Sequence, residues 1–321
     1  MLFFVFSSIT FYNILAGFAF SGFLVGELLT HEKVGIVPKI SLYLYTRGGE
    51  TAAAWSIVNL LRMYCEELQV IIPHKAHSAG TLISIGANSI IMTKQATLGP
   101  IDPSINTPLN PQIPYATPPQ NTLPVSVEAV KGYLAFAKEE LSIKEESALS
   151  SIMIKLSEMV HPLVLGQVYR SRAQIKMLAE KLLANQVNDP AKIQQIIAFL
   201  CSDSGSHDYT INRREARNSL GLKIETPNTE MYAIIKSIYD SISEELEFNI
   251  PFDLGKIAQS GTGEYTVKRG LIESVEGGCD CFITQGRLKA VNIDPNQFGL
   301  HATMPQQGVQ DERIFEGWKH L

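Results

Sequence analysis

The strongest constraint on the fold of this chain is the alternation of apolar strand-like runs with helical runs between residues 40 and 93. Short β-branched and aromatic runs predict strands, and the longer runs between them have helical spacing. The predicted order is a strand at 40–46, a helix at 50–68, a strand at 70–73, a short helix to about residue 88 and a strand at 90–93. Strands joined by helices form parallel sheets with right-handed crossovers, so an α/β fold is expected.

Two of the turns that follow these strands carry small residues suited to chemistry. Gly48 and Gly49 follow the first strand, and Ser78 lies in the run AHSAGT between a strand and a helix. The carboxyl ends of successive parallel strands meet at one edge of a sheet, where ligands bind. The sequence therefore predicts a site in which Ser78 is the nucleophile and the N–H groups of Gly48, Gly49 and Ala79 form an oxyanion hole.

Composition excludes several classes of function. The 321 residues are 45% hydrophobic and 18% charged, which favours a large core over disorder. The net charge of −5 and the lack of a basic stripe argue against nucleic-acid binding. Four cysteines are too few for a disulfide framework in a chain of this length. Cys279 and Cys281 resemble half of a metal site but have no nearby partners in the sequence, so no metal or other cofactor is expected.

The beginning of the chain allows two interpretations. The first 26 residues carry no charged side chain, and the run 2–25 is long enough to span a bilayer. Alternatively, these residues form core strands and a buried helix, which we favour because serine, threonine and asparagine interrupt the run. Basic residues begin at Lys33, so a membrane anchor would leave the body of the protein in the cytoplasm. We expect a cytoplasmic protein, with membrane association through residues 1–26 as the alternative.

A proline-rich segment separates the two halves of the chain. Residues 100–124 hold eight of the sixteen prolines, a density that predicts a long loop without regular structure. Long loops in compact domains are often functional. The loop is therefore interpreted as a lid over Ser78 or an oligomer contact, with a surface detour as the other possibility.

The second half of the chain is predicted to be largely helical. Apolar residues recur at helical spacing in 125–141, where Ser126 can act as the N-cap, and helices are also expected at 163–185, 191–201 and 231–246. Residues 206–221 predict a strand or turn followed by a helix. From Phe252 onward, glycines and short β-like runs predict a small β-rich appendage. The chain is therefore divided into a hydrophobic segment at 1–30, a catalytic domain at 31–225 and a C-terminal region at 226–321.

Three motifs in the first half of the chain resemble one protein family. They are YTRGG at 45–49, PHKAHSAGTLI at 73–83 and LGPIDPS at 98–104. Together they look like the serine dehydrogenase proteinase (SDH) family of the ClpP/crotonase superfamily. The resemblance implies a ClpP-like β/α superhelical fold with helical additions, ATP-independent hydrolysis of peptide bonds, Ser78 as nucleophile, and Gly49 and Ala79 as oxyanion donors. It also implies a homo-oligomer that acts on polypeptide substrates.

The general base is not fixed by these motifs. The stretch 98–102, where Clp subunits place their histidine, contains none. Membrane-associated relatives use a lysine, and Lys138 is similar to it in position; the alternative is an ordinary solvated lysine. A lysine acts as a base only if desolvation lowers its pKa. His207, next to Asp208, is the second candidate, or else a structural residue. Asp102 could orient a base or cap local backbone groups.

Two other functions remain open on the sequence. The chain could be a non-catalytic scaffold with the same fold that binds peptides or membranes, which the lack of a Clp-type histidine favours. It could also resemble a crotonase-like acyl-CoA enzyme, which uses paired oxyanion donors on a thioester and needs no serine. No coenzyme A signature is visible in the sequence, so the serine protease is the first choice.

Overall fold

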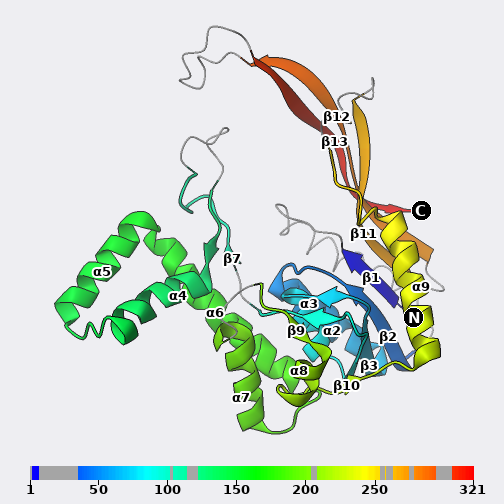
Figure 1. The fold of residues 1–321 in the computed structure, drawn as a ribbon, viewed down its shortest axis with the longest axis horizontal. Helices are drawn as coiled ribbons and strands as arrows, with labels where there is room; N and C mark the ends of the chain where they lie inside the picture. The colour runs from blue at the N-terminus through cyan, green and yellow to red at the C-terminus, as the bar shows by residue number, and fades with distance from the viewer. Residues whose placement is uncertain are drawn as a thin grey trace. The chain divides into compact units, whose positions relative to one another are not determined.

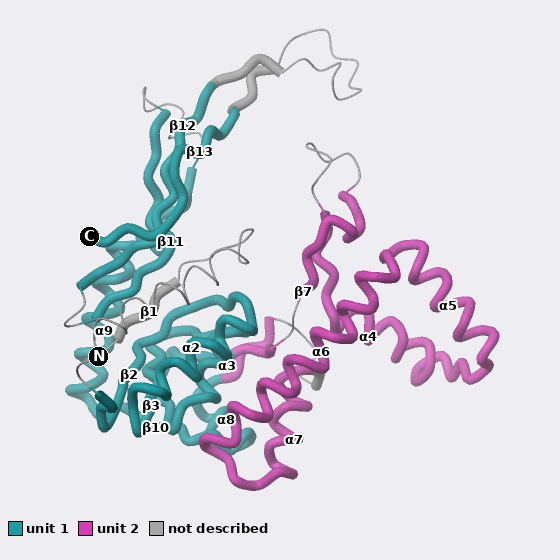
Figure 2. The backbone as a smooth tube through the Cα atoms, turned by 180° about the vertical axis from the view of Figure 1, so that it is seen from behind, with its two compact units in different colours: residues 1–98, 212–321 teal, residues 99–211 magenta. Residues whose placement is uncertain are grey.

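A computed structural model describes residues 2–6, 35–101, 104–113, 122–203, 208–253, 257, 263–274, 278–293 and 306–321. The chain forms two compact units (Figures 1 and 2). Unit 1 contains residues 1–98 and 212–321, and unit 2 contains residues 99–211. Unit 1 is therefore built from two separate stretches of sequence.

The parallel sheet predicted from the sequence is confirmed and forms the core of unit 1. Its strands have the order β10-β5-β3-β2-β1, and every neighbouring pair is parallel. The strands are β1 (Leu2–Phe6), β2 (Val37–Tyr45), β3 (Cys65–Ile72), β5 (Ser89–Met92) and β10 (Ile224–Glu225). Residues 68–72 and 89–92 are buried throughout. Such continuous apolar runs are typical of strands covered on both faces.

Three long antiparallel strands continue this sheet beyond β1. They are β11 (Glu264–Ser274), β12 (Gly278–Ile293) and β13 (Gln306–His320), and they complete an eight-stranded sheet. The β-rich C-terminal region expected from the sequence is confirmed, and its strands are long. Strand β1 joins it to the parallel sheet, because β1 pairs parallel with β2 and antiparallel with β11.

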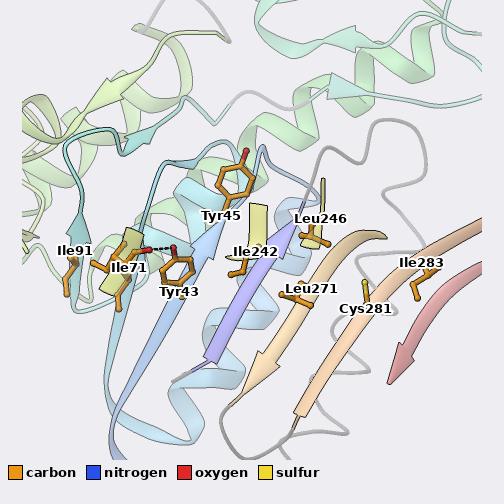
Figure 3. Packing of buried hydrophobic residues seen from close by; sticks show 10 residues of the cluster. Tyr43, Tyr45, Ile71, Ile91, Ile242, Leu246, Leu271, Cys281 and Ile283 are labelled. Carbon is orange, nitrogen blue, oxygen red and sulfur yellow. Dashed lines mark hydrogen bonds between the residues drawn. The ribbon is translucent and has the colours of Figure 1, made fainter. Parts of the chain in front are cut away.

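Helices cover the sheet of unit 1. They are α2 (Thr51–Met63), α3 (Ala79–Ile85), α8 (Arg213–Asn218) and α9 (Thr229–Glu245). Alternate residues of β2 point to opposite faces. Tyr43 and Tyr45 belong to a core cluster with Ile235, Ile242 and Leu246 from α9 and the loop that follows it (Figure 3). The hydroxyl of Tyr43 donates a buried hydrogen bond to the carbonyl of Ile235 at 2.9 Å.

Unit 2 is mostly helical. It contains α4 (Val127–Ala135), a π-helical turn η1 (Phe136–Glu140), α5 (Glu146–Met159), α6 (Pro162–Leu183), α7 (Pro190–Ala198) and a second π-helical turn η2 (Phe199–Asp203). The predicted cap is confirmed, because the Ser126 hydroxyl accepts a hydrogen bond from the N–H of Ala129 at 3.1 Å. The sequence analysis missed α5, in which no residue is fully buried.

The proline-rich segment contains regular structure, contrary to expectation. Strand β7 (Ser104–Ile105) pairs antiparallel with β8 (Val125–Ser126). The ribbon is held by the buried amide of Asn110, whose nitrogen donates to the carbonyl oxygens of Ile105 at 2.6 Å and Leu123 at 2.9 Å. Residues 102–103 and 114–121 lie outside the described residues. The side chain of Asn110 thus replaces the strand hydrogen bonds that prolines cannot donate.

The hydrophobic beginning of the chain is described only in part. Residues 2–6 form strand β1, which agrees with the interpretation as core strands, and residues 7–34 lie outside the described residues. In the described part of the chain, no single helix has both the length and the apolar composition to cross a membrane. One bent pair, α5 with α6, reaches that length and composition only when its two helices are taken together.

Candidate functional site

The candidate site is centred on Ser78, which joins a short strand to a helix. The strand is β4 (Lys75–Ala76), which pairs parallel with β6 (Thr97–Leu98), and the helix is α3. Ser78 has φ 52° and ψ −112°, a conformation that residues with a side chain rarely adopt. Such strain costs about 1–3 kcal/mol and persists only where the surroundings enforce it. A serine on a strained strand-to-helix turn has the geometry of a nucleophile elbow, which exposes the hydroxyl.

The strand before this turn is held by the end of β2. The N–H of Thr46 donates to the carbonyl of Lys75 at 3.0 Å, and the carbonyl of Thr46 accepts from the N–H of His77 at 3.1 Å. These two bonds flank the turn on its N-terminal side. The position of Ser78 therefore depends on residues that precede it by more than 30 positions, with Thr46 at the centre of the contact.

Close packing of α3 fixes the other side of the turn. The hydroxyl of Thr81 donates to the carbonyl of Ala76 at 3.0 Å, which ties the first turn of α3 to β4. A Cβ atom at Gly80 would overlap the Cγ2 atom of Thr46. Only glycine therefore allows α3 to begin so close to the end of β2. This close packing also determines the position of Ser78, which directly precedes α3.

Gly48 forms the wall next to Ser78. Its φ of 133° is a conformation that side chains disfavour. A Cβ atom added there would lie 3.0 Å from the Cβ and 3.5 Å from the Oγ of Ser78. The backbone of Gly48 and the hydroxyl of Ser78 are thus in direct proximity. The predicted meeting of the two small-residue turns is therefore observed for these two residues.

The backbone N–H groups around Ser78 differ in availability. The N–H of Gly48 donates to the Oγ1 atom of Thr46 at 3.1 Å, so it is already satisfied. Among the described residues, the N–H groups of Gly49 and Ala79 have no protein acceptor. These two groups are therefore available to an acceptor that the chain itself does not provide, whereas that of Gly48 is not.

His77 is directed to a different partner. Its Nε2 atom lies 2.9 Å from the hydroxyl oxygen of Thr97 in β6. Among the described residues of unit 1, no side chain forms a hydrogen bond with the hydroxyl of Ser78. His77 therefore interacts with β6 rather than with Ser78, its neighbour in the chain.

The three residues proposed as base or supporting group lie in unit 2. Lys138 lies in η1 with an exposed side chain. Its helical neighbour Lys131 forms an ion pair with Glu128 at 3.5 Å. His207 and Asp102 lie outside the described residues, and Asp208 is exposed. The roles of Lys138, His207 and Asp102 therefore stay predictions.

Sequence reasoning missed an aromatic cluster directly behind the site. His74, the residue before β4, stacks on Tyr239 of α9 with ring centroids 5.8 Å apart, and it meets Tyr45 edge-on at 6.3 Å. Tyr45 stacks in turn on Phe248 at 4.7 Å. Burial, followed by the charge of Lys75, lowers the pKa of His74. Burial raises the pKa of Tyr45 to about 12, with a smaller contribution from Tyr239. The members of this aromatic cluster come from three segments that are distant in the sequence, so no local motif could have revealed the cluster.

The paired cysteines of β12 are thiols in an apolar setting. Cys279 and Cys281 are both free, and Cys281 is fully buried. Burial raises the pKa of each thiol to about 11, which disfavours the thiolate that a metal requires. In the described part of the chain, no three histidine, cysteine or acidic side chains gather into a group that could hold a metal ion.

Two curated relatives from Methanocaldococcus jannaschii match this chain. The uncharacterized protein MJ0137 is 27% identical over 201 residues, which cover 62% of this chain and 58% of that protein. The uncharacterized protein MJ1495 is 27% identical over 187 residues, which cover 58% of this chain and 52% of that protein. The chain therefore spans little more than half the length of these relatives.

Two solved structures show weaker similarity. A membrane-bound stomatin-specific protease, in complex with a substrate peptide, has a TM-score of 0.37 and 12% identity, covering 67% of this chain and 72% of that one. ClpP1 from Listeria monocytogenes has a TM-score of 0.35 and 13% identity, covering 66% of this chain and 87% of that one.

A family model also matches, and it covers the candidate site. The model describes ClpP-like SDH-type serine proteinases, and its match extends over residues 34–118. This segment contains β2, the Gly48 wall, the Ser78 turn and β5. It agrees with the family that the sequence motifs resemble. Over residues 34–118, the chain is therefore similar to the family of ClpP-like SDH-type serine proteinases.

Proposed function

We propose that this protein is a serine peptidase that hydrolyses peptide bonds without ATP, with Ser78 as its nucleophile. The observation that carries the proposal is the strained conformation of Ser78, at φ 52° and ψ −112°, directly beside Gly48. Strain of this kind must be offset by other interactions, and it serves to present a hydroxyl to a substrate. The match of residues 34–118 to a model of serine proteinases supports the same reaction.

The proposed mechanism follows from the groups around Ser78. Its Oγ attacks the scissile carbonyl carbon while a general base accepts the hydroxyl proton. The carbonyl oxygen becomes an oxyanion, and the N–H groups of Gly49 and Ala79 donate hydrogen bonds to it. The C–N bond then breaks, and the leaving amine receives the proton from the base. Water attacks the resulting ester on Ser78 in the same way and releases the second product.

Lys138 is proposed as the base, with His207 as the second choice. Lys138 is exposed in the single chain. A lysine acts as a base only where it is desolvated, so the role requires that bound substrate or a second copy of the chain covers this side chain. A homo-oligomer, expected from the family resemblance, would supply such a cover.

A fluorophosphonate probe tests the proposed nucleophile. The probe forms a covalent bond with an activated serine, and we expect the full-length protein to be labelled. Ser78→Ala should abolish both labelling and hydrolysis of a quenched fluorescent peptide. Ser56→Ala is the matched control, because Ser56 is exposed on α2 and its hydroxyl only donates to the carbonyl of Ala52. Equal labelling of the Ser78→Ala and wild-type proteins would refute the assignment.

A further inference from the structure

Two cationic side chains, Arg47 and Lys75, lie beside the Ser78 turn. The carbonyl of Lys75 accepts a hydrogen bond from the N–H of Thr46 at 3.0 Å, so Lys75 is adjacent to the residue that precedes Arg47. Arg47 in turn precedes Gly48, which lies directly beside Ser78. Both cations therefore belong to the two backbone segments that hold Ser78 in place.

The side chains of Arg47 and Lys75 are accessible from solvent. Thr46 and Ala76, which pair in a parallel bridge, are 3% and 0% exposed. Arg47 is exposed and Lys75 is half-buried. Burial, followed by the positive charge of Arg47, lowers the pKa of the Lys75 ammonium group. The two charges are therefore close enough to repel each other at the rim of the site.

No acidic side chain compensates these charges in the described part of the chain. Neither Arg47 nor Lys75 forms an ion pair there, although several ion pairs occur elsewhere in both units. The acid nearest to Arg47 in the sequence is Glu50. Burial raises the pKa of Glu50, and no ion pair joins its carboxyl to either cation in the described part of the chain. An uncompensated cationic pair is also unusual in a chain of net charge −5.

We propose that Arg47 and Lys75 form an anion subsite that binds a carboxylate of the peptide substrate beside the bond that Ser78 cleaves. The inference rests on the proposed function. An extended peptide spans about 3.3–3.6 Å per residue, and the proposed subsite would take a carboxylate one or two residues from the scissile bond. The Arg47 guanidinium can bind a carboxylate with two hydrogen bonds, and Lys75 adds a point charge.

Peptide binding tests the subsite without relying on catalysis. The full-length Ser78→Ala protein is titrated into three fluorescent peptides of otherwise equal sequence, and binding is followed by anisotropy. One peptide has an internal glutamate and an amidated C-terminus, the second has glutamine and a free C-terminal carboxylate, and the third has glutamine and an amidated C-terminus. We expect at least one carboxylate peptide to bind about tenfold more tightly than the third, the effect of one charge-assisted contact.

The peptide that binds more tightly identifies the source of the carboxylate. The preference should disappear in the Arg47→Gln/Lys75→Gln variant and persist in Lys94→Gln, which removes an exposed charge from the same unit. Should the double variant fold poorly by circular dichroism, Arg47→Gln alone replaces it, since that side chain is exposed. Raising the salt concentration should weaken the preference in the same way.

The subsite and the peptidase can fail separately. Equal binding of the three peptides, no binding of any, or a preference that survives both substitutions would overturn the subsite. None of these results affects the labelling of Ser78 by the fluorophosphonate. Conversely, an unlabelled wild-type protein that still prefers carboxylate peptides would keep the subsite and remove the peptidase.

Discussion

The Cβ position of Gly48 lies 3.0 Å from the Cβ of Ser78, closer than two such atoms normally approach. A side chain at residue 48 would therefore fit only if the backbone of residue 48 or the Ser78 turn shifted. This contact between two residues 30 positions apart makes the glycine part of the site, although it contributes no functional group.

Substitution of Gly48 should impair the nucleophile more than substitution of its neighbour. We expect Gly48→Ala to reduce the rate of fluorophosphonate labelling at least tenfold, because the new methyl group crowds Ser78 and the φ of 133° disfavours alanine. Gly49→Ala is the control, since a Cβ at that position meets no atom within 4 Å. Equal loss in both variants would show that the contact with Ser78 is not the cause.

Gly80 should be required for stability, and its requirement should depend on Thr46. Gly80→Ala is expected to lower the free energy of unfolding by about 1–3 kcal/mol, the usual cost of overpacking. Thr46→Ser removes the Cγ2 atom that the new methyl group would overlap while it keeps the hydroxyl. The double variant should therefore recover part of the loss in urea denaturation. Strict additivity of the two single effects would contradict this explanation.

The hydroxyl of Tyr43 should stabilise the packing of α9 on the sheet. Tyr43→Phe removes a buried hydrogen bond of 2.9 Å to the carbonyl of Ile235. We expect a loss of about 0.5–1.5 kcal/mol, the usual net contribution of one hydrogen bond. Tyr169→Phe is the control, because that side chain is 77% exposed and its loss should be close to zero. Thermal denaturation of both variants measures the difference.

The thiols of Cys279 and Cys281 should react slowly with iodoacetamide at pH 8. Burial raises both pKa values to about 11, so the reactive thiolate is scarce until the pH rises well above 9. An exposed thiol introduced by Ser56→Cys should react about 100-fold faster, as its ordinary pKa implies.

The same pKa values predict how stability depends on pH. Unfolded thiols lose their protons near their ordinary pKa, whereas the folded thiols keep them, so the contribution to stability is present below about pH 9 and falls between about 9 and 11. Cys281→Ala should flatten this part of the profile in urea denaturation. A profile that is unchanged by the substitution would contradict the assignment to this residue.

Replacement of Lys138 tests its proposed role as base. Lys138→Ala and Lys138→Arg should both reduce peptide hydrolysis by at least 100-fold, because neither alanine nor a permanently charged arginine can accept the serine proton. Lys131→Ala is the control on the same helical segment. Full activity of Lys138→Ala would exclude Lys138 as the general base, and His207→Ala would be the next variant to measure.

The sequence could predict the parts of the fold that depend on local patterns. The strands around Val70 and Ile90 are continuous apolar runs, and Ser126 has the sequence position of an N-cap. The Ser78 turn was recognisable because small residues lie between a strand and a helix. In each case, the residues that determine the structure are neighbours in the chain.

Other features depend on residues that meet only in the folded chain. The ribbon in the proline-rich segment needs the side chain of Asn110 to replace missing strand bonds. The aromatic cluster behind the site joins His74, Tyr45 and Tyr239 from three elements. Helix α5 was not predicted, because it contains no fully buried residue and its pattern of apolar residues is weak. The proposed general base is of the same kind, since both Lys138 and His207 are remote from Ser78 in the sequence.

The place of β1 between β2 and β11 has a consequence for biosynthesis. Residues 2–6 are synthesised well before residues 264–274, which form one of their two neighbouring strands. Until then, one edge of β1 has no partner for its hydrogen bonds, and such an edge is prone to pairing with other chains. We therefore expect the nascent chain to need protection by chaperones until β11 has been translated. After that, β1 can form hydrogen bonds along both of its edges.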